Sequence, residues 1–456
     1  MIVEAADAIM LSQAVSLSSQ PSLPSLPSLG ARDANVSPAL HQCVATIIRG
    51  HSSSSSYVSA LAVDGDSLYI ASSDGSIMVW SLSLELEEAM SRRRQEHHHQ
   101  EADDAESCEA AATSKSPVKC LVATGNDGTV LSSHQDGKIR AWRRASGAQK
   151  NSEEEDGGGA HQHQRRRRLV LRAVLPTACD RLRTCLVPWS YVEVRRHRRR
   201  TWVHHVDAVA ALAVSPDGAL LYSASWDRSL KVWGLPGFRC LQSVPAAHDD
   251  AINAIVASPD GHVYTGSADR RIRAWRRRPE PDQRLVLVAT MERHRSAVNA
   301  LAIGGRDGRV LYSGACDRSV VVWERGGADD GRVMEATGTL RGHAKAILCL
   351  AAAGDVVCSG SADRTVRVWR RGQQGAENVS SSSSSAAGGY TCLAVLEGHG
   401  AAVKSLALVR SGGSSVEGES SSGGGGEGNG SVLVCSGALD GEVKIWSVLV
   451  PCLFET

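Results

Sequence analysis

The sequence predicts an all-β protein, a seven-bladed β-propeller built from four-stranded antiparallel blades. The first observation is a repeated spacing, in which an Asp is followed six residues later by a Trp, and seven of the ten tryptophans stand in this frame. The pairs are Asp74/Trp80, Asp136/Trp142, Asp227/Trp233, Asp269/Trp275, Asp317/Trp323, Asp363/Trp369 and Asp440/Trp446. Because the spacing is kept while the segments between the pairs vary in length, one supersecondary unit has been copied seven times.

The second observation is the strand pattern inside a copy, which is clearest around Asp227. Val209, Leu212 and Val214 belong to a first strand, and Ser-Pro-Asp-Gly at 215–218 is a turn by composition. Further strands are expected at 220–225, 230–233 and 238–244. Four short strands in roughly 40–45 residues are typical of one propeller blade.

Two more residue types recur in the repeat. A His opens five units, at His205, His248, His294, His343 and His399, each with an aliphatic residue four positions later. A hydroxyl stands four residues before the network Asp at Ser132, Ser223, Thr265, Ser313, Ser359 and Ser436. From about residue 41 to 450 the chain therefore resembles the WD-repeat propellers. The resemblance implies a buried chain of Trp, Ser or Thr, His and Asp in each blade, a structural role for these residues.

The chain departs from that family pattern in several places. No blade has Asp directly after the repeat Trp. In the first copy His51 is followed by a serine run, and in the second Ser114 stands where His is expected. We therefore expect incomplete networks in blades one and two.

Closure of the ring is also predicted. The chain nearly ends after the third strand of the seventh unit, and a lone strand-like stretch at 43–48 precedes the first unit. This stretch would supply the outer strand of the last blade and remove an open edge. The alternative is an isolated N-terminal strand beside an open array.

The remaining segments are predicted to lie outside the blades. Residues 1–40 form a Ser/Pro/Leu-rich tail that we expect to be disordered, before a propeller over 41–450 with inserts at 85–114, 145–204, 373–389 and 411–431. Within the third insert and the fourth, Ser and Gly dominate. The histidines at 97–99, 161 and 163 are interpreted as solvated polar loops instead of a metal site, because no Cys or carboxylate accompanies them at ligand spacing.

Net charge, cysteine spacing and the length of apolar runs indicate which kind of protein this is. The net charge is +1, and the twelve cysteines are scattered without a Cys-x-x-Cys pair, which indicates a reduced, intracellular protein. No apolar run reaches the roughly 18 residues that a membrane span needs, and acidic residues near the start argue against a targeting peptide. We expect a cytoplasmic location, with the nucleus as an alternative, and neither cofactor nor metal.

The second half of insert 145–204 is not of low complexity. Residues 167–174 are expected to form the outer strand of blade two. The segment that follows, with its LPT, DRL and RRH elements leading into HVDAVAALAVS, resembles the plant Jingubang-type subgroup of WD-repeat proteins. This resemblance implies a non-enzymatic regulator in plant signalling or development. The arginines at 195, 196, 198, 199 and 200 are interpreted as a solvated edge, a nuclear import signal or a patch for acidic partners.

The leading functional hypothesis is a rigid scaffold for protein–protein contacts. An enzyme is disfavoured because the recurring Asp and His residues are occupied by the blade networks, which leaves no catalytic residues to name. Nucleic-acid binding through the Arg-rich insert is disfavoured by the neutral overall charge. A ubiquitin-ligase substrate receptor is a further alternative, but the only Trp-Asp pair, Trp226-Asp227, lacks the x-Arg that such receptors typically carry.

A candidate partner-binding surface follows from the turn after the second strand. Four consecutive blades carry Arg directly after the network Asp, at Arg228, Arg270, Arg318 and Arg364, whereas the other three have Gly. Trp226 stands beside them without a role in the repeat. Exposed Trp and Arg dominate many interfaces, and Arg binds carboxylates and phosphates. The alternative is that these are ordinary turn residues, paired with acids such as Asp249 and Asp250.

Overall fold

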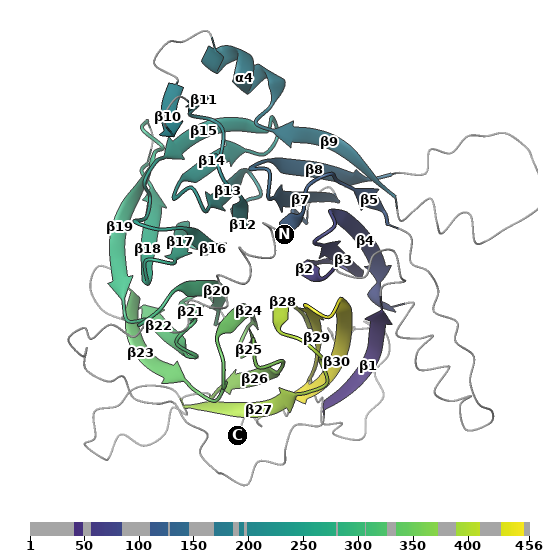
Figure 1. Ribbon diagram of the computed structural model, residues 1–456. Coiled ribbons are helices and arrows are strands. Elements are labelled where there is room, and N and C mark those ends of the chain that lie inside the picture. Colours follow the sequence, from purple (N-terminus) through teal and green to yellow (C-terminus); the bar gives the residue numbers. More distant parts are fainter. Residues whose placement is uncertain are drawn as a thin grey trace, which may run out of the picture.

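Seven four-stranded antiparallel sheets surround a central axis in the computed structural model, which confirms the predicted propeller (Figure 1). The structure describes residues 41–48, 56–83, 110–125, 128–145, 168–185, 191–195, 198–279, 281–305, 307–325, 334–372, 389–410 and 430–450. Apart from one short helix and one hairpin, all described secondary structure belongs to the blades.

Each blade has its first strand at the axis and its fourth at the rim. Blade one contains β2 (Val58–Asp64), β3 (Ser67–Ser72), β4 (Ser76–Ser81) and β5 (Ala112–Thr113), and blade two contains β6 (Val118–Ala123), β7 (Thr129–His134), β8 (Ile139–Arg144) and β9 (Leu169–Leu175). Blade three has β12 (Val209–Val214), β13 (Leu220–Ser225), β14 (Leu230–Gly234) and β15 (Arg239–Val244), and blade four has β16 (Ile252–Ala257), β17 (His262–Ser267), β18 (Arg271–Arg277) and β19 (Leu285–Glu292).

The last three blades follow the same order. Blade five is formed by β20 (Val298–Gly304), β21 (Val310–Ala315), β22 (Val320–Arg325) and β23 (Met334–Leu340), and blade six by β24 (Ile347–Ala353), β25 (Val356–Ser361), β26 (Val366–Arg371) and β27 (Tyr390–Leu396). Blade seven joins β28 (Val403–Arg410), β29 (Gly430–Ala438) and β30 (Glu442–Val450) to β1 (His41–Ile48).

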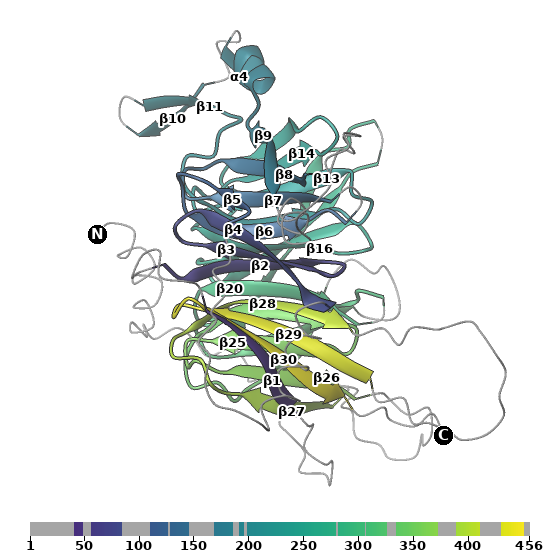
Figure 2. The same cartoon turned by 90° about the vertical axis from the view of Figure 1, so that its right-hand side faces the viewer.

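The ring closes as predicted, through the first described strand of the chain. β1 pairs antiparallel with β30, with Cys43 opposite Trp446 and Ile47 opposite Val443. Figures 1 and 2 show β1 lying along the outer side of β30. The two ends of the propeller sequence therefore share one sheet, so the last blade does not present an unpaired edge there.

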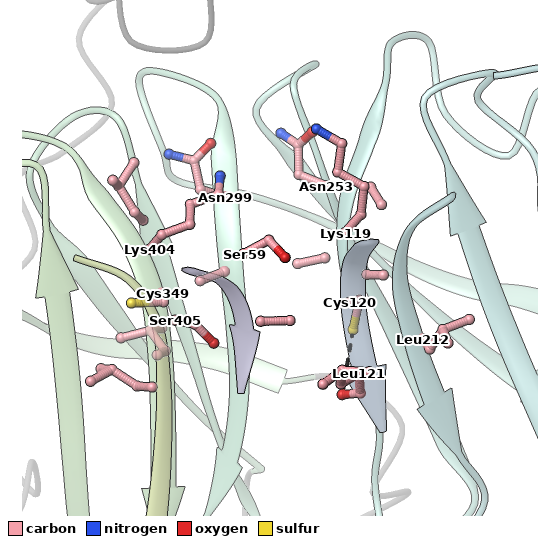
Figure 3. Close-up of a pocket in the computed structure, with 18 of the residues that line it drawn as sticks. Ser59, Lys119, Cys120, Leu121, Leu212, Asn253, Asn299, Cys349, Lys404 and Ser405 are labelled. Carbon is pink, nitrogen blue, oxygen red and sulfur yellow. Dashed lines mark hydrogen bonds between the residues drawn. The ribbon is translucent and has the colours of Figure 1, made fainter. Parts of the chain in front are cut away.

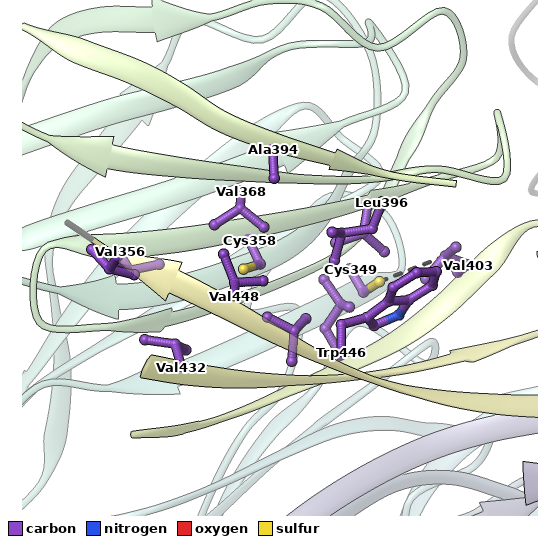
Figure 4. Packing of buried hydrophobic residues seen from close by; sticks show 14 residues of the cluster. Cys349, Val356, Cys358, Val368, Ala394, Leu396, Val403, Val432, Trp446 and Val448 are labelled. Carbon is purple, nitrogen blue, oxygen red and sulfur yellow. Dashed lines mark hydrogen bonds between the residues drawn. The ribbon is translucent and has the colours of Figure 1, made fainter. Parts of the chain in front are cut away.

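The core consists of seven apolar clusters, each at the seam between two neighbouring blades. Figure 4 shows the seam of blades six and seven, where Cys349 and Cys358 of blade six meet Val403 and Trp446 of blade seven. At every seam the Trp of the Asp-x5-Trp frame packs on the preceding blade. The repeat Trp thus contributes its ring to the core between blades as well as its N–H to a blade network.

The insert between blades two and three is partly structured. Its first strand, β9, is the rim strand of blade two, close to the predicted 167–174. It continues into α4 (Ala178–Cys185) and a hairpin of β10 (Tyr191–Arg195) and β11 (Arg198–Thr201), which project outward from the ring in Figure 2. Asp180 anchors α4, because it exchanges hydrogen bonds with Thr177 and accepts one from the backbone N–H of Cys240 on β15.

Several sequence predictions fall outside the described residues. These are the tail 1–40, the histidines at 97–99, 161 and 163, most of insert 85–114, and nearly all of inserts 373–389 and 411–431. At the end of insert 85–114 the structure places the short rim strand β5.

Candidate protein-interaction face

Blade three shows how the repeat residues are joined. The indole N–H of Trp233 donates to the Ser223 hydroxyl at 2.9 Å, and that hydroxyl lies 2.8 Å from His205 Nε2. The other ring nitrogen, Nδ1, is 3.3 Å from a carboxylate oxygen of Asp227. The chain of bonds links the loop before β12, the turn after β13 and the strand β14. Because each group has a partner, the buried network satisfies itself without water.

Burial and hydrogen bonding determine the charges in this network. Burial would raise the pKa of Asp227, but the hydrogen bonds from His205, Ser229 and the Val206 backbone hold that pKa well below its ordinary value. Burial lowers the pKa of His205. The network therefore consists of an ionised carboxylate and a neutral imidazole near pH 7, with Nδ1 facing both the Ser229 hydroxyl at 2.9 Å and Asp227 at 3.3 Å.

The same bonds recur in blades four to six. The His Nδ1 to Asp Oδ2 distances are 2.9 Å, 3.0 Å and 2.9 Å in the pairs His248/Asp269, His294/Asp317 and His343/Asp363. The Trp N–H donates to the matching hydroxyl at 2.8–3.0 Å in Trp275, Trp323 and Trp369. These residues are thus engaged within their blades.

Blade seven keeps the network in a looser form. His399 Nε2 lies 2.8 Å from the Ser436 hydroxyl, to which Trp446 donates at 2.9 Å. His399 Nδ1, however, is 3.5 Å from Asp440 and makes no hydrogen bond with the described residues. Ligand atoms of His399, Asp440 and Glu442 lie within 4.8 Å of one another. Glu442 is already paired with Lys444 at 3.0 Å.

Blade one has an incomplete network, as expected. Its hydroxyl position is occupied by Ile70, which is buried. The buried indole N–H of Trp80 accordingly has no hydrogen-bond partner within the described residues. Asp74 bonds within its own turn, to the backbone N–H and hydroxyl of Ser76 at 2.9 and 2.7 Å.

In blade two the network is incomplete, as expected, because the Asp136 carboxylate takes no part in it, but a histidine from another position is present. His134, a fully buried residue of β7, lies 2.8 Å from the Ser132 hydroxyl, to which Trp142 donates at 2.7 Å. Its other nitrogen bonds the Ser116 carbonyl at 2.9 Å. The histidine therefore comes from the second strand instead of the loop. Asp136 is released from the network and pairs with Arg140 at 2.8 Å.

The four candidate arginines lie on one end of the ring, here called the turn face, which carries the turns between second and third strands. The inner strands begin at this end, because the backbone N–H of Trp226 donates to Ala208 and that of Cys316 to Ala297. All four arginines are exposed, and all adopt the left-handed backbone conformation, with φ of 68°, 72°, 68° and 73° at Arg228, Arg270, Arg318 and Arg364.

Two of the glycine turns lie close against the loop that leads into the next blade. A Cβ added to Gly75 would lie 2.1 Å from the Ser114 carbonyl oxygen, and one added to Gly137 would lie 2.8 Å from that of His205. Both have a positive φ as well. These two turns thus have no room for a side chain, which the sequence pattern does not reveal.

Asp249, one of the acids considered as a partner of these arginines, pairs with residues of β18. Asp249 pairs with Arg271 at 2.5 Å and lies 3.8 Å from Arg273. Arg228, Arg318 and Arg364 make no ion pair with any residue in the described ranges. Their guanidinium groups are available to a partner.

Trp226 differs from the expectation of an exposed aromatic. It is half-buried, and the ammonium of Lys119 lies 5.0 Å from its ring centroid, within the range of a cation–π contact. Trp226 also lines a cavity at the mouth of the central channel. Its side chain therefore belongs to the channel wall next to the arginine turns.

These features define a WD-repeat propeller, and the chain belongs to that family. The profile of the WD domain, G-beta repeat, matches residues 41–81, 196–234, 238–276, 285–324, 334–370 and 390–447, together more than half of the chain. Blade two, with its rerouted network, lies outside these matches. The WD40 propeller domain of Doa1 is similar in structure, with a TM-score of 0.53 and 16% identity, covering 90% of this chain and 97% of that one.

Curated relatives match over shorter segments. The chain is similar to human kinesin-like protein KIF21A (30% identity over 137 residues) and to Autophagy-related protein 16 of Arabidopsis thaliana (32% over 145 residues), which cover 30% and 31% of it. It is also 45% identical to human striatin-4 over 60 residues, 12% of the chain. The matched segments span only 8%, 26% and 8% of the three relatives. Among the described residues, no helical segment has the length and hydrophobicity needed to cross a membrane.

Proposed function

We propose that this protein is a non-enzymatic scaffold that binds acidic or phosphorylated segments of partner proteins on its turn face. WD-repeat propellers generally bind other proteins, and binding residues on such folds sit in loops held by a rigid core. The observation that carries the proposal is the run of four exposed arginines on equivalent turns of consecutive blades.

The charges on neighbouring loops indicate which sector of the turn face would bind the partner segment. Exposed Arg295 and Lys345 lie in the inner loops of blades five and six, whereas exposed Asp207, Asp249 and Asp250 lie in those of blades three and four. Positive charge is therefore least compensated around Arg318 and Arg364. Guanidinium groups donate paired hydrogen bonds to carboxylates and phosphates, so an acidic or phosphorylated segment fits this sector.

The unusual backbone conformation supports a role beyond turn formation. A non-Gly residue in the left-handed region costs about 1–2 kcal/mol. Glycine would avoid this cost and is used in the three other blades. Retention of a long cationic side chain at four strained positions is consistent with selection for the charge.

The proposal includes a biological setting. We infer a cytoplasmic protein, with entry into the nucleus if the arginines around 195–200 act as an import signal. Membership of the Jingubang-type subgroup, and with it a role in plant regulatory or developmental signalling, stays a prediction that rests on the residues between 175 and 214.

A peptide array tests the proposed function. It would present each sequence with Ser, phosphoserine or Glu at one position. Wild-type protein should retain acidic and phosphorylated peptides in preference to the Ser versions, and the variant Arg318→Glu/Arg364→Glu should lose most of this signal. The matched control is Arg239→Glu/Arg276→Glu. These two arginines are exposed and lie at the end of the ring opposite the turn face. Equal loss in both variants, or no preference by the wild type, would contradict the proposal.

A further inference from the structure

In blade seven an acidic residue stands two positions after the network Asp. In blades three, five and six this position is Ser229, Ser319 and Thr365, and the hydroxyl of each donates to Oδ1 of the network Asp at 2.5–2.7 Å. In blade seven it is Glu442, and no other repeat has an acid at this position. A second carboxylate therefore lies beside Asp440, where those three blades have a hydroxyl.

The histidine of the same blade has one ring nitrogen without a partner. His399 Nε2 lies 2.8 Å from the Ser436 hydroxyl, which donates its own proton to the Lys444 carbonyl at 3.3 Å. In this arrangement Nε2 carries the ring proton and Nδ1 has a free lone pair. Nδ1 makes no hydrogen bond with the described residues, although the side chain is only 1% exposed. Buried polar atoms without a partner are rare and require an explanation.

Asp440 is held in place and retains one acceptor position. Its Oδ2 accepts the backbone N–H groups of Gly400 and Ala401 at 2.8 and 3.2 Å, and Oδ1 accepts that of Glu442 at 3.0 Å. A carboxylate has about four acceptor positions, so one stays available. Ligand atoms of His399, Asp440 and Glu442 lie within 4.8 Å of one another. The side chains of the two acids are 16% and 30% exposed, so a cation can reach them from solvent.

We propose that His399 Nδ1, Asp440 and Glu442 bind a Zn²⁺ ion, with water in the fourth position. Imidazole and carboxylates bind Zn²⁺ at about 2.0–2.2 Å, whereas Ca²⁺ and Mg²⁺ prefer oxygen ligands alone. The backbone N–H groups on Asp440 and the Ser436 hydroxyl on His399 would orient the ligands. The expectation of no metal rested on ligand spacing along the chain, which does not show residues that the fold brings together.

Lys444 is the group that opposes metal binding. Its ammonium pairs with Glu442 at 3.0 Å. A Zn²⁺ ion on the same carboxylate would displace this ammonium, because two positive charges repel each other at such a distance. Removal of the Lys444 charge should therefore tighten zinc binding, whereas removal of Glu442 should weaken it.

The proposed site is separate from the cavity at the mouth of the central channel. The loop that contains His399 leads into β28, whose residues Lys404 and Ser405 line that cavity (Figure 3). None of the three proposed ligands is among the described residues that line it. A bound ion would instead join the loop before β28 to the turn before β30, in the blade that closes the ring through β1.

Calorimetric titration of chelator-treated protein with Zn²⁺ tests the proposal. Glu442→Ser, which introduces the residue of blades three and five, should bind one ion fewer than the wild type or bind that ion at least about tenfold more weakly. The comparison cancels zinc that binds elsewhere on the chain. The matched control Glu397→Ser removes the same charge from an exposed residue near His399 and should bind like the wild type. Ca²⁺ should not replace Zn²⁺.

Two further measurements identify the ligands. Lys444→Gln should bind Zn²⁺ more tightly than the wild type. Co²⁺ at the site should give the visible absorption of a tetrahedral ion without the charge-transfer band that thiolate ligands produce. Zinc should also raise the melting temperature of the wild type more than that of Glu442→Ser, because an ion bound to the folded state stabilises it. Melting without zinc checks that the variants fold.

Four outcomes would overturn the proposal. These are wild-type zinc binding by Glu442→Ser, an equal loss in Glu397→Ser, an equal affinity for Ca²⁺, and an affinity for Zn²⁺ that Lys444→Gln does not raise. Peptide capture on the turn arginines is measured separately, so failure of the zinc site would leave the scaffold function standing.

Discussion

Ser132 and His134, two residues apart on β7, hydrogen-bond to each other at 2.8 Å and form the buried network of blade two with Trp142. In blades three to five the network histidine comes from a loop 17 to 19 residues before its hydroxyl partner. In blade two, by contrast, the hydroxyl and the histidine that bonds to it lie on one strand. Removal of this histidine gives a direct test of what a network contributes.

His134→Ala should lower the free energy of unfolding by about 1–3 kcal/mol, because Ser132 and the Ser116 carbonyl lose a buried partner. Urea unfolding at pH 7 measures the effect. Replacement by Gln, whose amide can donate and accept, should cost less. Equal stability of His134→Ala and wild type would show that the blade does not depend on this network.

Asp227 should likewise be structural. Asp227→Ala removes the acceptor of the Val206 N–H and leaves His205 Nδ1 with the Ser229 hydroxyl alone, and we expect a loss of about 1–3 kcal/mol. Asp307→Ala is the control, since its pair with Arg309 at 3.8 Å is highly exposed and contributes close to zero. A variant of Asp227 that melted like wild type but lost a partner selectively would argue for a binding role.

Acid should destabilise the protein in two stages. Burial lowers the pKa of His134 to about 4, below the ordinary 6.5. Below pH 6.5 the unfolded chain takes up a proton that the folded chain refuses, so stability falls as pH drops toward 4, by about 3 kcal/mol for this residue. His134→Gln should show a shallower loss between about pH 7 and pH 4.5. If the variant lost stability with falling pH as steeply as the wild type, His134 would not be the group responsible.

The second stage involves the network carboxylates. The pKa of Asp269 is lowered to about 2, where burial is outweighed by bonds from His248 and backbone N–H groups. Its stabilisation is present above the ordinary carboxyl pKa and is lost as pH falls from about 4 toward 2. Asp269→Asn should flatten this part of an acid-unfolding curve. A curve that kept the wild-type slope would show that other carboxylates dominate.

The turn arginines should contribute to peptide binding and slightly lower the stability of the fold. Arg318→Gly removes a side chain from the left-handed region and should leave stability unchanged or raise it by up to about 1 kcal/mol, while peptide capture falls. The reverse change, Gly137→Arg, should destabilise, because its Cβ would meet the His205 carbonyl. Thermal melting and the peptide array report the two effects. A large loss of stability in Arg318→Gly would show that this arginine has a structural function.

The arginines at 195, 196, 198, 199 and 200 allow a test of where in the cell the protein resides. Replacement of all five by Gln should shift a fluorescent fusion toward the cytoplasm if they act as an import signal. The melting temperature should not change, because the hairpin of β10 and β11 projects from the ring. An unchanged distribution would leave the solvated-edge interpretation.

The architecture of this protein can be predicted from the amino-acid pattern alone. The Asp-x5-Trp frame and the Ser-Pro-Asp-Gly turn place the strands of blade three within one or two residues, and a strand before the first repeat predicts closure. These features are local or periodic, so they can be read along the chain. The candidate arginines were found in the same way, since they occupy one position of the repeat.

Which side chains meet across blades depends on the three-dimensional fold. His134 lies outside the repeat position of the loop histidines, and its role depends on the distance to Ser132 and Ser116 in the fold. Lys119 and Lys404 are far apart in the sequence and reach one cavity because inner-strand bulges turn them toward the axis. Contacts of this kind arise from ring closure and from backbone irregularities, which leave no periodic signal in the amino-acid pattern.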